Sequence, residues 1–374
     1  MTDSDDYRYM ARALQLAERG LYSTDPNPRV GCVLVRDGAI VGEGWHERAG
    51  EPHAEVHALR EAGERARGAT AYVTLEPCCH QGRTPPCSDA LIEAGVARVV
   101  AAMSDPNPLV AGGGLARLQA AGIATASGLL AAESAALNPG FVSRMRHSRP
   151  YVRCKLAMSL DGRTAMASGE SKWITGAAAR ADVQRLRARS SAILTGAGTV
   201  LADDPALTVR IDAAQAQRQP LRVVLDSGLR MPATARMLNE PGATLVLTTN
   251  NAEAPRAALE AAGAEVVRLP AGNDGVDLTA VMDELNRRAL NEVLLETGAV
   301  LAGAMLRAGL IDELIVYLAP VLLGDAARGL LHLPGLDRMD HRIGVEIFDV
   351  RSVGEDWRIT VAIRDKRQEA RGKS

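Results

Sequence analysis

The sequence is short of aromatic residues and of long apolar runs. Phe, Trp and Tyr together make up 3% of its 374 residues, so aliphatic side chains must fill most of the core. No run approaches the roughly 18 apolar residues that a membrane-spanning helix requires. The start, MTDSDDYRYM, is acidic, unlike a signal peptide. We therefore expect no membrane association and a cytoplasmic location.

The sequence also lacks a strong charge of either sign. Its formal net charge is −2 at pH 7, and its clearest basic stretch is the ending RDKRQEARGKS, which is typical of a solvated tail. Proteins that bind nucleic acid usually carry a positive electrostatic footprint. The composition therefore favours a small-molecule substrate over a nucleic acid.

Cysteines are few and odd in number. Three of the five fall between positions 78 and 87. A disulfide framework needs paired cysteines in an oxidising compartment, so reduced thiols, some of them on a metal ion, fit this pattern better. Cys32 and Cys154 are expected to be core thiols.

The length of the chain predicts two domains. A polar, basic stretch at 144–152 marks the boundary, which we place between residues 1–147 and 148–374. Strands alternate with helices in the first half, which predicts an α/β fold with a mostly parallel sheet and helices on both faces. A second alternating pattern follows. The expected strands are 30–35, 39–44, 69–75, 97–103, 151–159, 191–196, 222–226, 244–249, 292–297 and 313–320, and the helices of the first half are 54–67 and 87–95.

One histidine and two cysteines in the first half form a pattern of metal ligands. His53 opens an expected helix, Cys78 follows an expected strand, and Cys87 opens the next helix. Three ligands leave the fourth tetrahedral position of Zn²⁺ for water, as in catalytic zinc sites, and helix N-termini favour thiolates. Glu55 is placed to move the proton of that water. This H-x-E and P-C pattern is the signature of zinc deaminases.

The cysteine spacing departs from the usual zinc deaminase pattern. The second ligand usually follows the first by three residues, whereas Cys87 lies nine residues after Cys78. Cys79 is an alternative ligand, although Cys78 holds the position after proline. His57, one helical turn beyond His53, is another candidate, although a structural role on the helix face is the simpler interpretation.

Longer motifs carry a family resemblance over nearly the whole chain. HAEVHAL at 53–59 and TLEPCCHQGRTPPCSDAL at 74–91 resemble the deaminase half of the bifunctional riboflavin-biosynthesis deaminase–reductases, which have the longer cysteine spacing. KLAMSLDGRTA at 155–165, AILTGAGTVLADDPALTVR at 192–210 and ETGAVLAGAMLRAGLIDE at 296–313 resemble the reductase half. The resemblance implies a cytidine-deaminase-like three-layer domain followed by a dihydrofolate-reductase-like domain.

The resemblance also implies two consecutive reactions. The 2-amino group of 2,5-diamino-6-(5-phosphoribosylamino)pyrimidin-4-one is hydrolysed to give 5-amino-6-(5-phosphoribosylamino)uracil, and NADPH then reduces the ribosyl group to ribityl. For the deaminase half it implies Zn²⁺ on His53, Cys78 and Cys87, with Glu55 as the catalytic proton shuttle. The implied substrate contacts of this half are Asn27, His46, His80 and Arg83.

The second half has no G-x-G-x-x-G dinucleotide fingerprint. Glycine-bearing segments at 196–199 and 298–304 instead follow expected strands, where bare helix N-termini can receive a phosphate; helix capping and close packing are the alternative. The resemblance places substrate at Ser171, Arg187, Leu207, Arg210 and Glu296, with Lys155 as a further polar candidate. It places NADPH at Ala157, Trp173, Thr199, Asp203, Ser227, Gly298, Ala299, Val300, Leu301, Ala302, Gly303 and Ala304.

Three questions stay open on the sequence. The second half could be only a binding or dimerisation module behind a deaminase, although its reductase motifs argue against this. A nucleic-acid deaminase is disfavoured by the near-neutral charge and by the absence of interleaved arginines and aromatics. Asp203 could orient substrate or assist proton transfer, and its neighbour Asp204 could be a simple cap. The family also implies a homo-oligomer, a dimer or larger.

Overall fold

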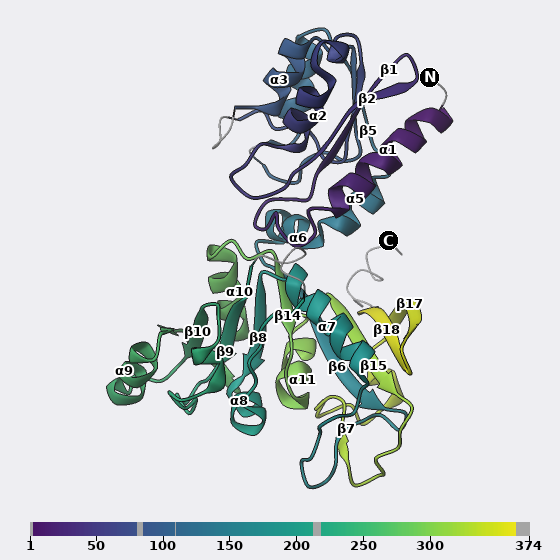
Figure 1. Ribbon diagram of the computed structural model, residues 1–374. Coiled ribbons are helices and arrows are strands. Elements are labelled where there is room, and N and C mark those ends of the chain that lie inside the picture. The colour runs from purple at the N-terminus through teal and green to yellow at the C-terminus, as the bar shows by residue number, and fades with distance from the viewer. Residues whose placement is uncertain (1–2, 81–84, 109, 212–217, 364–374) are drawn as a thin grey trace. The chain divides into compact units, whose positions relative to one another are not determined.

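The computed structural model describes residues 3–80, 85–108, 110–211 and 218–363. The chain divides into two compact units, Met1–Arg149 and Pro150–Ser374, each built around its own β-sheet (Figure 1). Within the described residues, no helix is both long and apolar enough to cross a membrane.

The first unit has a five-stranded sheet in the order β2-β1-β3-β4-β5. Two of its four pairings are antiparallel, so the expectation of a mostly parallel sheet is wrong for this unit. The chain reverses between β1 and β2 at Asp37 and Gly38, which both have positive φ, and the α2 crossover then returns it to the other side of β1. The strands are β1 (Gly31–Arg36), β2 (Ala39–Trp45), β3 (Thr70–Val73), β4 (Arg98–Ala101) and β5 (Ala124–Ser127).

Helices cover both faces of this first sheet. Val33 and Val35 of β1 pack with α1, whereas Cys32 and Leu34 pack on the opposite face with α2 and α3, as the period of a strand requires. A Cβ atom on Gly44 would lie 2.3 Å from the carbonyl oxygen of Ala54, so β2 holds the start of α2 closely. The helices are α1 (Asp3–Glu18), α2 (Ala54–Ala62), α3 (Cys87–Ala94), α4 (Gly113–Ala120), α5 (Ala131–Leu137) and α6 (Pro139–His147), and a 3₁₀ turn spans Gly63–Ala66.

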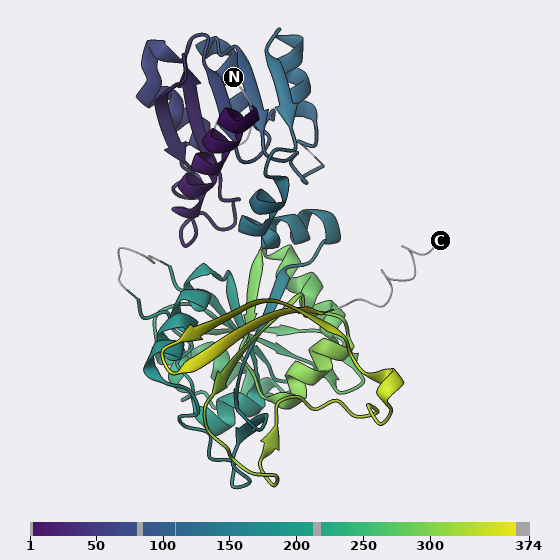
Figure 2. The same cartoon turned by 90° about the vertical axis from the view of Figure 1, so that its right-hand side faces the viewer.

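The second unit has a nine-stranded sheet in the order β11-β10-β9-β8-β14-β6-β15-β18-β17. Six of its pairings are parallel, and only β15–β18 and β17–β18 are antiparallel among the described strands. The sequence patterns missed β11 and the final hairpin, which is the twisted yellow ribbon of Figure 2. The strands are β6 (Tyr151–Ser159), β8 (Ala192–Gly196), β9 (Leu221–Leu225), β10 (Thr244–Thr248), β11 (Ala264–Arg268), β14 (Glu292–Leu295), β15 (Glu313–Ala319), β17 (Val345–Val353) and β18 (Asp356–Ile363).

Two groups of helices sandwich the second sheet. Side chains of α10 and α11 pack on one face, and those of α7, α8 and α9 pack on the other. Two short strand pairs, β7–β16 and β12–β13, lie outside this sheet. The helices are α7 (Ala177–Arg189), α8 (Ala197–Asp203), α9 (Glu253–Ala261), α10 (Leu278–Arg287) and α11 (Ala299–Arg307), with 3₁₀ turns at Arg236–Asn239 and Met339–His341; the short strands are β7 (Arg163–Ala165), β12 (Ala271–Gly272), β13 (Gly275–Val276) and β16 (Arg328–Gly329).

Candidate active sites

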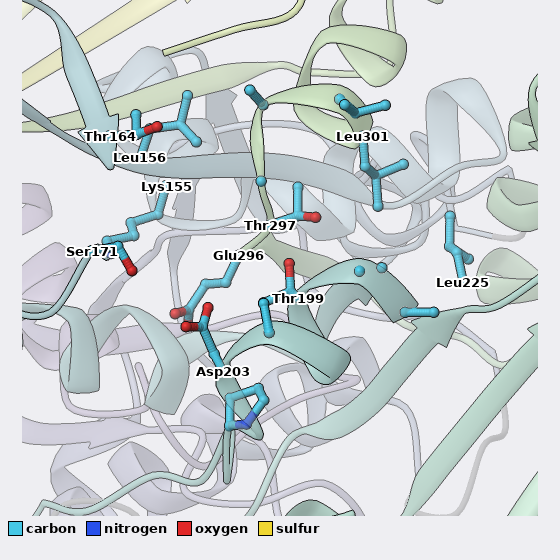
Figure 3. A pocket seen from close by; sticks show the side chains of 18 of the residues that line it. Lys155, Leu156, Thr164, Ser171, Thr199, Asp203, Leu225, Glu296, Thr297 and Leu301 are labelled. Carbon is cyan, nitrogen blue, oxygen red and sulfur yellow. The ribbon is translucent and has the colours of Figure 1, made fainter. Parts of the chain in front are cut away.

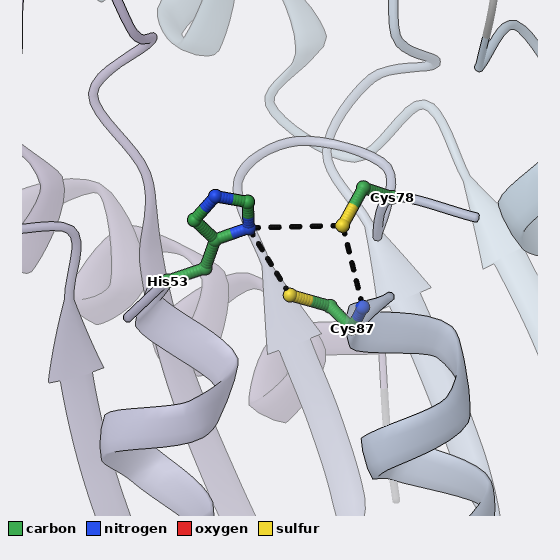
Figure 4. Close-up of side chains that lie close together, drawn as sticks. All are labelled: His53, Cys78 and Cys87. Carbon is green, nitrogen blue, oxygen red and sulfur yellow. Dashed lines mark hydrogen bonds between the residues drawn. The ribbon is translucent and has the colours of Figure 1, made fainter. Parts of the chain in front are cut away.

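The three expected zinc ligands of the first unit converge. The ligand atoms of His53, Cys78 and Cys87 all lie within 4.8 Å of one another (Figure 4). His53 Nδ1 lies 3.2 Å from Cys87 Sγ and 3.7 Å from Cys78 Sγ, and the Cys87 N–H donates to Cys78 Sγ at 3.3 Å. One imidazole and two thiols in this arrangement match the donor set of a tetrahedral zinc site with one position left open.

Helix starts and a strand end place these ligands. His53 is the N-cap of α2 and makes no side-chain cap bond, so its ring is available to a metal ion. Cys87 is the first residue of α3, and Cys78 lies in the loop that follows β3. Hydrogen bonding from Cys87, and then from His53, lowers the pKa of the Cys78 thiol below its usual value, although burial opposes this. The site therefore favours the thiolate that binds metal.

Glu55 provides a second sign that a ligand belongs here. Its side chain lies in the first turn of α2 and is 3% exposed, and its Oε2 atom is buried without a hydrogen-bond partner. Burial raises the pKa of this carboxyl group. A buried carboxylate oxygen without a hydrogen-bond partner destabilises the fold unless a bound ligand supplies that hydrogen bond. The unpaired Oε2 atom therefore fits a pocket for a water molecule activated by a metal ion.

Neither alternative zinc ligand joins the cluster. Among the described residues, the group of potential ligands contains His53, Cys78 and Cys87, without Cys79 or His57. Cys79 instead lies against the start of α4. A Cβ atom on Gly113 would lie 2.9 Å from the Cys79 sulfur. His57 lies beside Gly44 of β2, and its Nε2 atom is buried.

Two of the four expected substrate contacts of this unit adjoin the zinc ligands. His46 packs edge-on against His53, with ring centroids 5.2 Å apart. Its Nδ1 lies 3.1 Å from the Pro52 carbonyl, and its Nε2 lies 3.1 Å from Asn27 Nδ2. Burial lowers the pKa of His46 to about 4, so the ring is neutral at pH 7. His80 is exposed, and Arg83 lies outside the described residues.

The second unit contains a cavity of about 1790 Å³ along the carboxyl ends of β6, β8, β9 and β14 (Figure 3). This edge is where open α/β sheets bind their ligands. The cavity is also lined by Lys172, Arg230 and Thr297, which the sequence patterns did not single out although each flanks an expected site segment. The expected site residues on its walls are Ala157, Ser171, Trp173, Arg187, Thr199, Asp203, Leu207, Arg210, Ser227, Glu296, Gly298, Ala299, Val300, Leu301 and Ala304.

Two expected NADPH residues do not line the cavity. Ala302 is fully buried in the core beneath α11. A Cβ atom on Gly303 would lie 2.0 Å from the carbonyl oxygen of His332, so this glycine serves close packing of α11 against a neighbouring segment. The helical period turns both residues away from the cavity that Gly298 and Ala299 face.

A buried ion pair forms the polar wall of the cavity. Arg187 of α7 contacts both carboxylate oxygens of Glu296, at 2.6 Å from Nε and 2.9 Å from Nη2, and donates to the Thr208 carbonyl at 3.0 Å. Burial alone would raise the pKa of Glu296, but Arg187 and Lys155 hold it below its usual value. Burial lowers the pKa of Lys155, although the charge of Glu296 opposes this.

Two bare helix N-termini open onto the same cavity. Gly196 precedes α8 and Gly298 precedes α11, and neither helix has a side-chain cap. Cβ atoms on Gly198 and Gly298 would meet nothing within 4 Å, so the backbone there is open to a ligand. Backbone N–H groups at such ends bind phosphate, which fits a dinucleotide. Asp204 instead accepts from the Arg236 N–H and so has a local structural partner.

Comparisons with known proteins agree with this two-part architecture. Residues 3–103 match the family model of the cytidine and deoxycytidylate deaminase zinc-binding region, and residues 150–359 match that of the RibD C-terminal domain. The chain is 56% identical to the riboflavin biosynthesis protein RibD of Escherichia coli over 367 residues, covering 94% of this chain and 97% of the relative. The chain belongs to the RibD family.

Solved structures of the RibD family share the fold over nearly the whole chain. A structure of Acinetobacter baumannii RibD matches with a TM-score of 0.90 at 47% identity, covering 97% of this chain and 99% of that one. A Thermotoga maritima structure, titled a diaminohydroxyphosphoribosylaminopyrimidine deaminase/5-amino-6-(5-phosphoribosylamino)uracil reductase, matches with a TM-score of 0.84 at 32% identity, covering 96% and 99% of the two chains.

Family membership confirms the predicted fold class and the predicted pair of activities. The chain is a hydrolytic deaminase and a reductase, and its cofactors are Zn²⁺ and NADPH. The alternative of a deaminase whose second half is only a binding or dimerisation module is not favoured, because the RibD C-terminal domain is matched over residues 150–359.

Proposed function

We propose that the chain catalyses two consecutive steps of riboflavin biosynthesis on one phosphoribosylated pyrimidine. Residues 1–147 hydrolyse the 2-amino group of 2,5-diamino-6-(5-phosphoribosylamino)pyrimidin-4-one and release ammonia. Residues 148–374 reduce the ribosyl group of the resulting uracil to ribityl. The observation that carries this proposal is the convergence of His53, Cys78 and Cys87 beside the buried Glu55, in a chain whose second unit holds a dinucleotide-sized cavity.

In the deaminase reaction, His53, Cys78 and Cys87 hold the zinc ion and Glu55 is the catalytic residue. Bound zinc lowers the pKa of a water ligand to about 7. Glu55 takes the proton of the attacking water, donates it to the ring nitrogen beside the reacting carbon, and then serves the leaving amine. The buried, unpartnered Oε2 atom supports this role, because a raised pKa lets the carboxyl hold a proton between the two transfers.

Asn27 recognises the edge of the pyrimidine ring, and His46 contributes by orienting the Asn27 amide. The Pro52 carbonyl can only accept a hydrogen bond, so the neutral His46 carries its proton on Nδ1 and its Nε2 accepts from the Asn27 amide. This fixes the amide orientation and leaves Asn27 Oδ1 and one N–H for the ring. His80 and Arg83 contact the substrate phosphate, because imidazole and guanidinium N–H groups can donate hydrogen bonds to its oxygens.

In the reductase, Arg210 holds the ribose phosphate and Arg187 orients Glu296. The Arg187 guanidinium is already committed to Glu296 and to the Thr208 carbonyl, whereas the exposed Arg210 makes a long contact of 3.5 Å to Thr208 Oγ1. Planar guanidinium geometry suits a phosphate. Lys155, on the cavity wall near Glu296, contacts the ribose, and the remaining substrate contacts are Ser171 and Leu207.

Residues at the α8 and α11 ends of the cavity would hold NADPH, which would supply the reducing equivalents for the ribose C1′ atom. The small residues Gly298 and Ala299 would leave the N-terminus of α11 open to its diphosphate. Ala302 and Gly303 act only through the packing of that helix. Asp203 orients substrate or assists the accompanying proton transfer, and the other contacts are Ala157, Trp173, Thr199, Ser227, Val300, Leu301 and Ala304.

The edge of the second sheet supports a homo-oligomer. Strand β17 is a nine-residue edge strand, and Ile347, Phe348 and Val350 on it are more than half exposed, with Trp357 of β18 at 48%. A long, exposed, apolar edge strand can pair with a strand of another chain. The same edge of a second copy, related by a two-fold axis, provides that strand. Light scattering should give a dimer or larger assembly for the natural chain and a smaller mass for Phe348→Asp. An unchanged mass would assign the contact to another surface.

A cytoplasmic location is the last part of this proposal. All five cysteines are free thiols, and Cys78 and Cys87 must stay reduced to bind metal. Reduced thiols persist in cytosolic conditions and are oxidised in secretory ones.

A coupled assay with the purified chain tests the proposal. The diamino pyrimidine should release ammonia first, and NADPH oxidation should follow only as the deaminated product accumulates. Supplying that product directly should remove the lag. Ammonia release without any NADPH oxidation, even with the deaminated product supplied, would leave a deaminase with a binding module.

A further inference from the structure

Glu76 is a buried acid that the proposed chemistry does not use. It lies between the end of β3 and the metal ligand Cys78, and its side chain is 3% exposed. Its carboxylate accepts four backbone hydrogen bonds. Oε1 accepts from Gly114 N at 2.9 Å and Leu115 N at 3.2 Å, and Oε2 accepts from Gly112 N at 3.0 Å and Asp105 N at 3.1 Å. A carboxylate that accepts four hydrogen bonds uses its acceptor capacity within the protein.

The donors belong to the loop after β4 and to the start of α4. Gly114 and Leu115 lie in the first turn of α4, where helical N–H groups have no partner within the helix. A carboxylate at this end is further stabilised by the helix dipole. Glu76 therefore caps α4 from a different segment and closes the loop beside it.

A second contact ties the same segment to the residue next to the zinc ligand. A Cβ atom on Gly114 would lie 1.9 Å from the Pro77 carbonyl oxygen, so the two backbones touch and the position admits only glycine without displacement. Glu76 and Pro77, the two residues before Cys78, are thus both held by the start of α4. The sulfur of Cys78 has its place fixed through this backbone.

We propose that Glu76 is a positioning residue for the zinc site, which sets the Cys78 loop by clamping it to α4. This inference rests on the proposed zinc ligands. Glutamine cannot replace the acid, because one of its two terminal atoms donates and would face two N–H donors instead of accepting from them. A charged acceptor with four N–H partners is also worth more than neutral hydrogen bonds.

The test is Glu76→Gln in the full chain, loaded with zinc. Zinc release to a chromophoric chelator should become 10–100-fold faster, the range that supporting residues of metal sites give. Deaminase kcat should fall by a similar factor with a KM change below about threefold, because Asn27 and His46 adjoin His53 and not the segment that Glu76 holds. The reductase activity of the same sample, assayed with the deaminated pyrimidine, should stay unchanged.

Two further variants separate positioning from general stability. Glu61→Gln is a matched control, because Glu61 also accepts a backbone hydrogen bond, from Glu43 N at 2.8 Å, but on the far part of α2. It should leave zinc release unchanged. Gly114→Ala keeps the acid and displaces Pro77, so it should speed zinc release as Glu76→Gln does. If Glu76→Gln does not fold, Gly114→Ala provides the test in its place.

The outcomes are distinct from those of the proposed function. Zinc release at the natural rate in both Glu76→Gln and Gly114→Ala overturns the inference, as does equal acceleration in Glu61→Gln. Failure of the natural chain to deaminate the pyrimidine would overturn the proposed function instead, since zinc release is measured without substrate.

Discussion

The zinc site and the reductase cavity solve the problem of holding a ligand in opposite ways. The proposed zinc site is formed by the side chains of His53, Cys78 and Cys87, whose potential ligand atoms lie within 4.8 Å of one another. The reductase cavity encloses about 1790 Å³ and is built from the ends of four parallel strands and two open helix starts. Chemistry at the first site depends on particular atoms, whereas the second depends largely on backbone and shape.

This difference predicts how each site tolerates change. A side chain that moves a proton or binds a metal has no substitute, so a single replacement should be severe. A cofactor spread over many contacts loses only part of its binding energy when one contact changes. Three substitutions test this contrast, from the most to the least damaging.

Glu55→Gln should reduce deamination by 10³-fold or more, because the amide keeps the shape of the side chain but cannot carry the proton. Zinc content and reductase kcat/KM should match the natural chain. Ammonia release, metal analysis and NADPH oxidation with the deaminated pyrimidine measure the three quantities. Removing zinc with a chelator should abolish deamination and likewise leave reduction intact.

Activity of Glu55→Gln within tenfold of the natural chain would contradict the role of this acid. It would also make the zinc site as tolerant as the cavity and so break the contrast.

Arg187→Lys should reduce reductase kcat/KM by about 10–100-fold. A lysine ammonium cannot contact both oxygens of Glu296 in the forked geometry of the guanidinium, so the carboxylate loses its fixed orientation. Deaminase activity should not change. Arg185→Lys is the matched control on the same helix, because Arg185 is 63% exposed and lies 3.9 Å from Asp182; it should behave as the natural chain. A loss below twofold in Arg187→Lys would show that Glu296 needs no orienting partner.

Gly298→Ala should raise the KM for NADPH by about tenfold, or ~1.4 kcal/mol of binding free energy. The added methyl group meets nothing within 4 Å in the protein, and the backbone there, with φ of −77°, suits alanine. The unfolding temperature and the KM for the pyrimidine should therefore stay constant. An unchanged KM for NADPH would move the diphosphate away from the start of α11.

The sequence predicted particular local features well. The first two strands were expected at 30–35 and 39–44, and the structure has β1 at Gly31–Arg36 and β2 at Ala39–Trp45. The mostly parallel first sheet was wrong, because strand order depends on how α2 crosses the sheet, which local patterns do not encode. The β17–β18 hairpin was missed, because its exposed apolar residues do not follow the alternation of a half-buried strand.

The sequence also predicted more of the zinc site than of the cavity. Ligand chemistry restricts which residues can bind Zn²⁺, so residue type and order predicted His53, Cys78 and Cys87 as ligands, and the structure brings these three side chains together. Cavity walls draw on many residue types, so Ala302 and Gly303 could not be separated from Gly298 and Ala299 until α11 was seen to turn them into the core.

By itself, the sequence predicted the chemistry: a candidate set of metal ligands with an acid near the histidine, and a second half with reductase motifs. Only the tertiary structure decided which partner each of several side chains contacts. It pairs Arg187 with Glu296 rather than leaving it free for phosphate, fixes the proton of His46 on Nδ1, and clamps Glu76 to α4. Partners distant in sequence make these contacts, and a hydrogen bond between distant residues leaves no local pattern to read.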